Sequence, residues 1–473
     1  MQPDGIHSES NSFRDSVTTI SKDGKRRWVF AKRPSGSYYN KRGWISSFFL
    51  ILLFVGPFLT WNGHPLILFN VLERKFILFG IPFWPQDFFL FVLAMLTFFV
   101  FIILFTAIFG RVWCGWACPQ TIFMEMVFRK VEYWIEGDAN QQKQLAARPL
   151  DFYKVRRKVF KHALFLLIAF LIANVFLAYI VGVDQLELLV SDGPVNHQAG
   201  FYALLGFTGV FYGVYARFRE QVCLVVCPYG RLQGVLLDRN SLVIAYDYQR
   251  GDPRGKLHKN ENRLIGDCID CHQCVDVCPT GIDIRNGTQL ECVNCTACID
   301  ACDSVMEKVG FEKSLIRYAS ENNIANRDKF KVTSRIVGYA VLLLVLLTTL
   351  VSLLALRTDV EATLLRVPGQ LYQQQDGNRF SNLYTIQVVN KTFLDIPLTF
   401  GLENTPKGAE IRFVGNVIDK VHSDSLAEAV LFIVLPDSAL KGLKTPLILD
   451  VFSNGKMVDR VKTNFMGPTN TKY

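Results

Sequence analysis

Residues 268–279 read CIDCHQCVDVCP, and residues 292–302 read CVNCTACIDAC. The first stretch has the spacing Cys-x2-Cys-x2-Cys-x3-Cys-Pro, and the second repeats this spacing with Asp303 in place of the proline. In bacterial ferredoxins three closely spaced thiolates of such a run bind one [4Fe–4S] cluster, and the fourth binds the neighbouring cluster. Structural zinc sites instead use two separated Cys-x2-Cys pairs. The spacing therefore predicts a bacterial-type 2[4Fe–4S] ferredoxin domain spanning roughly residues 259–310.

The exchange of the fourth cysteine between the two runs predicts which thiolates share a cluster. One cluster takes Cys268, Cys271, Cys274 and Cys302, and the other takes Cys292, Cys295, Cys298 and Cys278. Two clusters in one small domain carry electrons but are not by themselves a catalytic centre. A reaction therefore needs a further site.

The remaining four of the twelve cysteines form two pairs, Cys114/Cys118 and Cys223/Cys227. Each pair has the spacing Cys-x3-Cys-Pro and follows an apolar segment, so the two pairs are an internal repeat of one motif. Cysteines at i and i+4 can share a helix face, and two such pairs can form one four-thiolate site. Soft thiolates select Cu(I), Zn or a further iron–sulfur cluster, and a redox-active dithiol is also possible. Small buried apolar residues are the alternative interpretation.

Part of the chain is predicted to lie in a membrane. Half of the residues are hydrophobic and 38 are Phe. A transmembrane helix needs about 20 apolar residues. Five segments meet this length, and they are Trp44–Trp61, Phe88–Gly110, Val159–Val181, Gly200–Ala216 and Ile336–Leu356.

The loop charges predict the orientation of the five spans. Residues 1–43 and residues 111–158 each carry nine Lys and Arg, whereas residues 182–199 carry none. Positive loops stay in the cytoplasm, so the N-terminus and the cysteine-rich region are predicted to be cytoplasmic. The C-terminus then lies in the periplasm, and the protein is expected in the inner membrane. The polar first 43 residues favour no cleaved signal peptide. The net charge of +9 is explained by these loops rather than by nucleic-acid binding.

The composition changes after the fifth span. Short β-branched and aromatic runs follow one another, and Asn454-Gly455 between two such runs indicates a hairpin. We predict an immunoglobulin-like β-sandwich that serves docking rather than redox chemistry. The predicted organisation is a basic segment at 1–43, four spans at 44–216, a cytoplasmic region at 217–335, the fifth span at 336–356 and the sandwich at 357–473.

Taken together, the basic N-terminus, the five spans, the paired Cys-x3-Cys-Pro motifs, the two ferredoxin runs and the terminal sandwich resemble the FixG/CcoG/RdxA family of cytochrome c oxidase accessory proteins. The resemblance covers nearly the whole chain. It implies a cupric reductase that converts Cu(II) to Cu(I) for assembly of the cbb-type haem–copper oxidase. In this reading Cys114, Cys118, Cys223 and Cys227 are the catalytic residues that bind copper or mediate its reduction. The implied partners are oxidase subunits, or a copper transporter or chaperone.

Two other functions fit the same motifs. The chain is either an electron conduit between the quinone pool and a partner, or a non-enzymatic platform for oxidase assembly. Its one Cys-x2-Cys-His stretch, Cys268–His272, lies inside the first ferredoxin run and belongs to that run, so no separate haem motif supports onward transfer through an outer face of its own. The sequence also has no Gly-x-Gly-x-x-Gly nucleotide motif, so a separate electron donor is expected.

Overall fold

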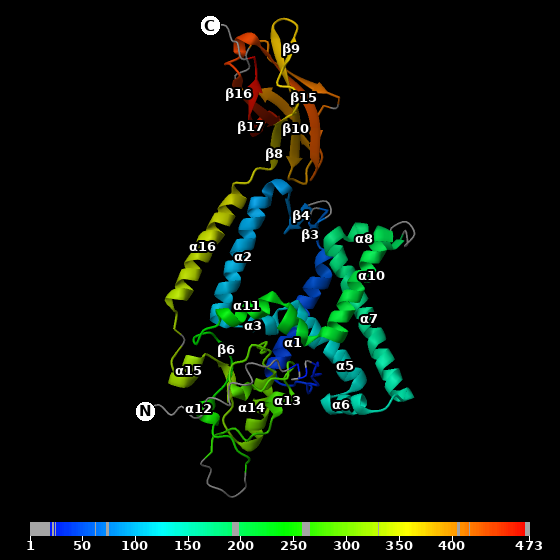
Figure 1. The fold of residues 1–473 in the computed structure, drawn as a ribbon, viewed down its shortest axis with the longest axis vertical. Coiled ribbons are helices and arrows are strands. Elements are labelled where there is room, and N and C mark those ends of the chain that lie inside the picture. The colour runs from blue at the N-terminus through cyan, green and yellow to red at the C-terminus, as the bar shows by residue number, and fades with distance from the viewer. Residues whose placement is uncertain are drawn as a thin grey trace. The chain divides into compact units, whose positions relative to one another are not determined.

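A computed structural model describes residues 19–468, except residues 21–22, 24, 62, 72–74, 192–197, 258–264, 330, 404–406 and 416. The first 18 residues of the predicted basic segment therefore lie outside the described part. The chain divides into two compact units (Figure 1). The first unit comprises Met1–Leu59 and Leu93–Leu347, and the second comprises Thr60–Val92 and Thr348–Tyr473. Two of the three boundaries between the units fall inside long helices, and the third lies between Leu59 and Thr60.

Five helices of the described residues are long and apolar enough to cross a membrane, in agreement with the number predicted. They are α1 (Ser37–Val55), α2 (Phe88–Phe109), α7 (Phe152–Val181), α10 (Gln198–Gly213) and α16 (Ser334–Ala355). The first begins seven residues before the predicted start, at Ser37 rather than Trp44. It ends at Gly56-Pro57, so Trp61 lies in a short strand instead of at the end of the span.

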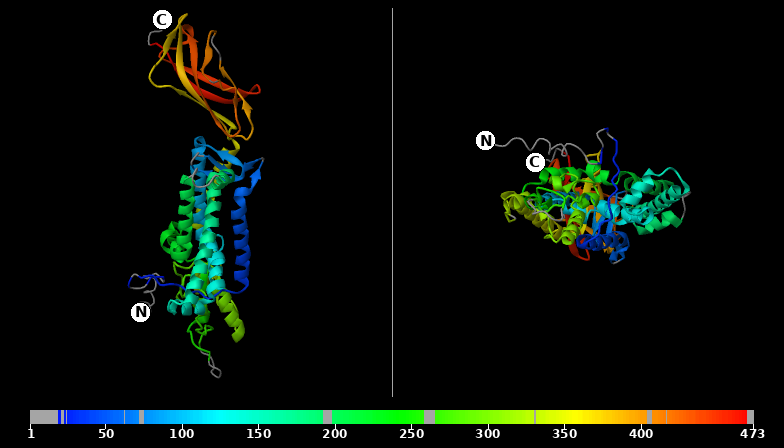
Figure 2. Two further views of the ribbon diagram at one scale, coloured as in Figure 1. Left: turned by 90° about the vertical axis from the view of Figure 1, so that its right-hand side faces the viewer. Right: turned by 90° about the horizontal axis from the view of Figure 1, so that it is seen from below.

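Helical segments after the second and fourth spans carry the two cysteine pairs. α3 (Val112–Trp116) contains Cys114, and a continuous helix follows as α4 (Pro119–Ile122), the π-helical η3 (Phe123–Phe128) and α5 (Arg129–Glu136). Within the 119–136 segment Glu125, Arg129, Glu132 and Glu136 are buried. α6 (Ala139–Ala147) leads into α7, which packs along α10 (Figure 2).

The corresponding segment after α10 contains η4 (Val214–Phe218), η5 (Val222–Val226) with Cys223, and α11 (Pro228–Leu236). A short α8 (Val183–Ser191) connects α7 with the loop before α10.

The cysteine-rich region folds around a two-stranded antiparallel sheet of β6 (Val243–Tyr246) and β7 (Ile316–Ala319). β6 precedes the two ferredoxin runs and β7 follows them, so the pairing of these strands brings the two ends of the domain together. Its helices are α12 (Tyr248–Gly251), α13 (Gln273–Asp276), η6 (Ile284–Asn286), α14 (Ala297–Val309) and α15 (Glu321–Asn326). The buried side chains between the sheet and α14 include Ile244, Ile299 and Met306.

The second unit contains strands that the sequence did not indicate between the first two spans. β1 (Thr60–Trp61) pairs with β2 (His64–Pro65), and β3 (Ile67–Asn70), β4 (Lys75–Leu78) and β5 (Ile81–Phe83) form a meander. A 3-10 turn, η2 (Pro85–Asp87), leads into α2. The buried Asp87 carboxylate pairs with Arg357 and Lys391, each at 2.7 Å. These contacts fix the strand segment to the base of the C-terminal domain.

The C-terminal domain is a β-sandwich, as predicted. One sheet has the order β13-β15-β10-β8 with β9 also paired to β10, the second has the order β12-β16-β17, and β11 pairs with β14. The strands are β8 (Val360–Arg366), β9 (Gln373–Gln375), β10 (Arg379–Asn390), β11 (Ile396–Pro397), β12 (Thr399–Leu402), β13 (Glu410–Val414), β14 (Lys420–Val421), β15 (Leu426–Pro436), β16 (Lys444–Ser453) and β17 (Lys456–Met466). A 3-10 turn, η7 (Asp437–Ala439), follows β15. Asn454 and Gly455 connect β16 to β17 with positive φ angles of 48° and 78°, which a two-residue type I′ hairpin requires. The predicted hairpin is therefore confirmed.

Candidate metal centres

The eight ferredoxin cysteines surround two cavities. Cavity I is lined by Cys268, Cys271, Cys274 and Cys302, with an empty volume of about 350 Å³. Cavity II is lined by Cys278, Cys292, Cys295 and Cys298, with an empty volume of about 330 Å³, and Cys274 borders both cavities. Apolar side chains such as Ile282, Ile316 and Met306 fill the remaining walls. A set of four thiols around an enclosed apolar space suits an iron–sulfur cluster.

The two loops around these cavities have the same backbone geometry. The residues on either side of Cys271 are Asp270 and His272, and both have left-handed φ angles, 53° and 56°. The residues on either side of Cys295 are Asn294 and Thr296, with φ angles of 53° and 66°. Left-handed non-glycine residues are uncommon, so their recurrence at equivalent positions shows that the sequence repeat is also a structural repeat.

Burial raises the pKa values of the cavity thiols. The pKa of Cys302 and that of Cys292 rise to about 12, and that of Cys295 rises to about 11. Neighbouring cysteines raise the pKa of Cys302 further. At neutral pH these thiols are therefore protonated without metal, and metal binding releases protons.

Three arginines from the membrane-associated segments lie around cavity II. Arg111 donates to the carbonyl oxygens of Leu290 and Cys292, and Arg129 donates to the Pro279 carbonyl at 3.4 Å. Arg42 of α1 is only 2% exposed, and its charge is the largest electrostatic influence on the Cys295 thiol. In the described part of the chain, neither Nε nor Nη2 of Arg42 has a hydrogen-bond partner. A buried guanidinium without partners is costly, so an anionic cluster in cavity II would satisfy it.

The first turn of α1 is attached directly to the ferredoxin fold. The backbone N–H groups of Tyr38 and Tyr39 donate to the two Asp300 carboxylate oxygens, at 3.1 and 2.8 Å. A carboxylate at a helix N-terminus also interacts favourably with the helix dipole. This cap holds the following turn, which carries Arg42, against cavity II.

The two cysteine pairs, which we call the membrane-edge thiols (Cys114, Cys118, Cys223 and Cys227), are brought together by the fold. Each pair begins five residues after the last residue of a span, Phe109 for Cys114 and Phe218 for Cys223. Arg111 joins the two motifs because its Nε donates to Gln233 at 2.5 Å and its Nη2 donates to the Gly230 carbonyl at 3.1 Å. The Cys114 thiol donates to the same Gln233 side chain at 3.5 Å.

Electrostatic coupling also links the membrane-edge thiols. Burial raises the pKa of Cys114 to about 11, and Cys118 and Cys227 raise it further. Burial raises the pKa of Cys223 to about 12, with additional contributions from Cys118 and Cys114. Cys114 and Cys223 therefore each lie within electrostatic range of the other three membrane-edge thiols. All four are partly buried.

The first membrane-edge motif contacts the ferredoxin loop beside cavity II. A Cβ atom on Gly115 would clash with the carbonyl oxygens of Val293 and Asn294, so the α3 backbone lies directly on the second ferredoxin loop. Cys114 packs in the same apolar cluster as Cys295 and Cys298. Arg111 bridges both sides because it bonds Gln233 beside the thiols and the Cys292 carbonyl at the cavity.

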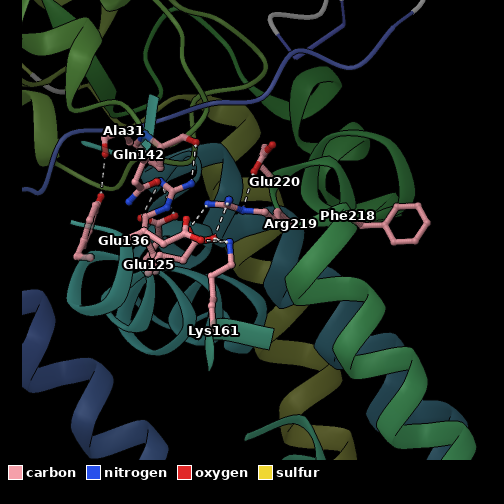
Figure 3. A network of polar contacts seen from close by, with 12 residues as sticks. Ala31, Glu125, Glu136, Gln142, Lys161, Phe218, Arg219 and Glu220 are labelled. Carbon is pink, nitrogen blue, oxygen red and sulfur yellow. Dashed lines mark hydrogen bonds and ion pairs between the residues drawn. The ribbon is translucent and has the colours of Figure 1, made fainter. Parts of the chain in front are cut away.

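A buried network of charges supports this arrangement (Figure 3). Glu132 pairs with Arg219 at 3.1 Å and with Lys161 at 3.6 Å, and Lys161 also pairs with Glu136 at 3.0 Å. Arg26 of the N-terminal segment pairs with Glu220 at 2.9 Å. The network thus ties together the N-terminal segment, α5, α7 and the turn that precedes Cys223.

The sequence reasoning missed Arg42, Arg111 and the buried carboxylates. Charged residues beside apolar spans were interpreted as solvent-facing loops that set the orientation. These residues differ from ordinary loop charges only in lying within a few residues of a cysteine motif or a span end. That sequence signal is too weak to identify them without a structure. His272 was predicted to be a surface side chain. It lies at the rim of cavity I, largely exposed, with Nδ1 at 3.0 Å from Arg285.

Comparison with known proteins agrees with these features. The 4Fe-4S dicluster domain model matches residues 218–321, the 4Fe-4S binding domain model matches residues 91–137, and the model of the IG-like fold at the C-terminal of FixG matches residues 350–468. The fold and the sites thus define a multi-pass membrane protein that binds iron–sulfur clusters and carries an immunoglobulin-like C-terminal domain.

Two curated relatives identify the family. Protein RdxB of Cereibacter sphaeroides is 34% identical over 79% of this chain and 81% of RdxB. Nitrogen fixation protein FixG of Rhizobium meliloti is 39% identical over 64% of this chain and 59% of FixG. The chain belongs to the FixG/RdxA family. A crystal structure of a FixG-related protein from Vibrio parahaemolyticus covers 23% of this chain at 17% identity, with a TM-score of 0.19 that carries no structural argument.

Proposed function

We propose that this protein is an iron–sulfur oxidoreductase that reduces Cu(II) to Cu(I) for assembly of a cbb-type haem–copper oxidase. The observation that carries the proposal is the contact of Cys114, Gly115 and Arg111 with the ferredoxin loop beside cavity II. Gly115 lies on the Val293–Asn294 loop, and Arg111 bonds groups on both sides. A one-electron pathway needs such a contact between its carriers and the place where the acceptor is reduced.

We propose that each cavity supplies the four ligands of one cluster. Cys268, Cys271, Cys274 and Cys302 hold one [4Fe–4S] cluster, and Cys292, Cys295, Cys298 and Cys278 hold the other. When bound, such clusters supply one-electron carriers whose potentials depend on nearby charge, hydrogen bonds and solvent. The buried apolar walls exclude water, and Arg42 and Arg111 supply positive charge at cavity II. Cys271 is exposed, so a soluble donor can approach cavity I.

The membrane-edge thiols are the proposed place where the substrate Cu(II) takes up one electron to become Cu(I). Soft sulfur donors stabilise Cu(I) over Cu(II), which favours reduction. We further propose that this region faces the cytoplasm, because the flanking loops are positively charged. The C-terminal sandwich then lies in the periplasm, where an oxidase subunit or a copper transporter is the proposed partner.

The test is an anaerobic assay of the dithionite-reduced protein with Cu(II), in which a chelator dye reports Cu(I). Gly115→Ala removes no thiol but forces the α3 backbone away from the Val293–Asn294 loop, so we expect a several-fold slower rate with unchanged iron content. Gly209→Ala in α10 is the matched control, because a Cβ there meets nothing within 4 Å. The variant with Cys114, Cys118, Cys223 and Cys227 all changed to Ala should produce no rapid, saturable Cu(I).

Equal rates in the wild type and in all variants would contradict the proposal. Electrons would then pass from the clusters to copper without using the membrane-edge site. In that case a conduit between the quinone pool and a partner, or a non-enzymatic assembly platform, would be the better interpretation.

A further inference from the structure

The two ferredoxin cavities leave four cysteines unexplained, and these four share one place in the fold. We propose that Cys114, Cys118, Cys223 and Cys227 together hold a third [4Fe–4S] cluster. The inference rests on the proposed function in one respect, because it concerns the site at which electrons are proposed to leave the ferredoxin region. It assigns the four thiols to a cluster, so that Cu(II) would take its electron from this cluster instead of binding to the four free sulfur atoms.

The distribution of cysteines along the chain supports a third cluster. The segment that matches a 4Fe-4S binding domain, residues 91–137, contains only Cys114 and Cys118. Two thiolates are half of the usual set of four, so this segment needs two ligands from elsewhere. The dicluster match, residues 218–321, contains ten cysteines, two more than two clusters use. The two extra cysteines are Cys223 and Cys227, which the fold brings to Cys114 and Cys118.

Both motifs present their thiols with the same local geometry. The second cysteine of each pair has an extended backbone, with φ −63° and ψ 123° at Cys118 and φ −69° and ψ 113° at Cys227. In each motif its N–H bonds the carbonyl five residues earlier, Trp113 at 2.9 Å and Val222 at 2.8 Å. A proline at the first helical position then starts the next helix. Two copies of one loop thus contribute one pair of thiols each to the same site.

The surroundings of the membrane-edge thiols suit an anionic, water-sensitive group. The Arg111 guanidinium is buried between the two motifs and interacts with both Cys114 and Cys223. Its fixed positive charge offsets the negative charge that four thiolates bring to a cluster. On the membrane side Tyr215 lies within electrostatic range of Cys118 and Cys223, and its ring stacks on Phe128 with centroids 4.4 Å apart. Both aromatic rings are buried.

The experiment is a count of metal and acid-labile sulfide in the anaerobically purified full-length protein. Three clusters correspond to about twelve irons and about twelve sulfides per chain, and two clusters to about eight of each. Two double variants, Cys114→Ser with Cys118→Ser and Cys223→Ser with Cys227→Ser, should each fall to about eight irons, because either change removes half of one ligand set. The matched control is Val226→Ser, a polar substitution at an exposed position beside Cys227 that should keep the full count.

Two results would overturn the inference. One is a wild-type count of about eight irons, which would decide the question even if the variants failed to fold. The other is about eight irons together with one copper or zinc ion that both double variants lose, which would indicate a single-ion site. Cu(I) production measured on the same samples separates the two proposals. Twelve irons without copper reduction would sustain the third cluster and refute the reductase, and eight irons with thiol-dependent reduction would do the reverse.

Discussion

Cavity I and cavity II arise from the same repeated loop, yet they differ in the exposure of their cysteines and in the charged residues beside them. At cavity I Cys271 is exposed, and the nearby Arg285 is neutralised by Asp283 at 2.6 Å and by Asp270. At cavity II Cys295 is buried and no cysteine is fully exposed, and Arg42, Arg111 and Arg129 approach from the membrane-associated segments. Water can therefore stabilise charge at cavity I, whereas fixed guanidinium groups must do so at cavity II.

This difference indicates how one sequence repeat acquires two roles. An exposed cavity with balanced charges is accessible to a donor protein and sensitive to salt. A more buried cavity beside the guanidinium groups of Arg42 and Arg111 has a potential set by the fold, and its ligands pack against Cys114. The asymmetry comes from the segments that dock on the repeat, not from the repeat itself.

Removing one ligand from each cavity should produce the largest contrast. Cys295→Ser and Cys271→Ser should each lose about four irons. After reduction with dithionite, Cys295→Ser should lose thiol-dependent copper reduction entirely, because cavity II is the one whose ligands pack against Cys114. Cys271→Ser should retain most of the rate, since dithionite reduces cavity II without cavity I. An equal loss of the copper reduction rate in both variants would contradict the different roles proposed for the two cavities.

The helix that holds Arg129 against cavity II should be sensitive to acid. Burial alone would raise the pKa of Glu132, but Arg219 and Lys161 outweigh burial and hold this pKa below its ordinary value. Its stabilising effect is therefore complete above the unfolded pKa of about 4.3 and is lost as the pH falls toward the folded pKa. Glu132→Gln should cost about 3 kcal/mol at neutral pH, because it leaves buried cations unpaired.

The measurement is thermal unfolding of the purified protein between pH 7 and pH 3. The wild type should lose stability below about pH 4.3, whereas Glu132→Gln should lack this part of the pH dependence. Glu312→Gln, a change at an exposed position within the ferredoxin region, is the control and should behave as the wild type. An identical pH dependence in the wild type and Glu132→Gln would show that the network does not support the fold.

The charge of Arg42 should set the potential of the cavity II cluster. A guanidinium several ångströms away in a partly buried site contributes on the order of 100 mV, and it favours the reduced, more negative state. Arg42→Gln should therefore lower one reduction potential by about that amount in an EPR-monitored titration. Arg42→Lys, which keeps the charge, should restore most of the shift. A change in the reduction potential of the cavity I cluster, or of neither cluster, would show that Arg42 does not act on cavity II.

Arg285→Gln at cavity I should have the smallest effect. Its charge is already balanced by two carboxylates, and water screens the site, so we expect a shift of roughly 30 mV in the potential of the cavity I cluster only. The same titration provides the measurement. A shift as large as that of Arg42→Gln would mean that cavity I is as well shielded as cavity II.

The features that the sequence predicted correctly depend on local patterns. Five spans follow from apolar runs of bilayer length, because the bilayer imposes the same requirement on each helix. The Asn454-Gly455 hairpin follows from the φ angles that its turn requires, and the two cysteine runs follow from ligand spacing. The strands between residues 60 and 83 escaped prediction because two- to four-residue strands leave too little alternation to recognise.

The sequence alone predicts the number of spans, the two ferredoxin runs, the paired membrane-edge motifs and the terminal sandwich, since each is encoded within a short stretch. Only the tertiary structure decided which groups meet across long separations. It placed Arg42 beside Cys295, Gly115 on the Val293–Asn294 loop, and Glu132 between Arg219 and Lys161. The physical reason is that burial and pairing of a charge depend on what packs against it, and those partners lie about 30 to more than 250 residues away in the chain.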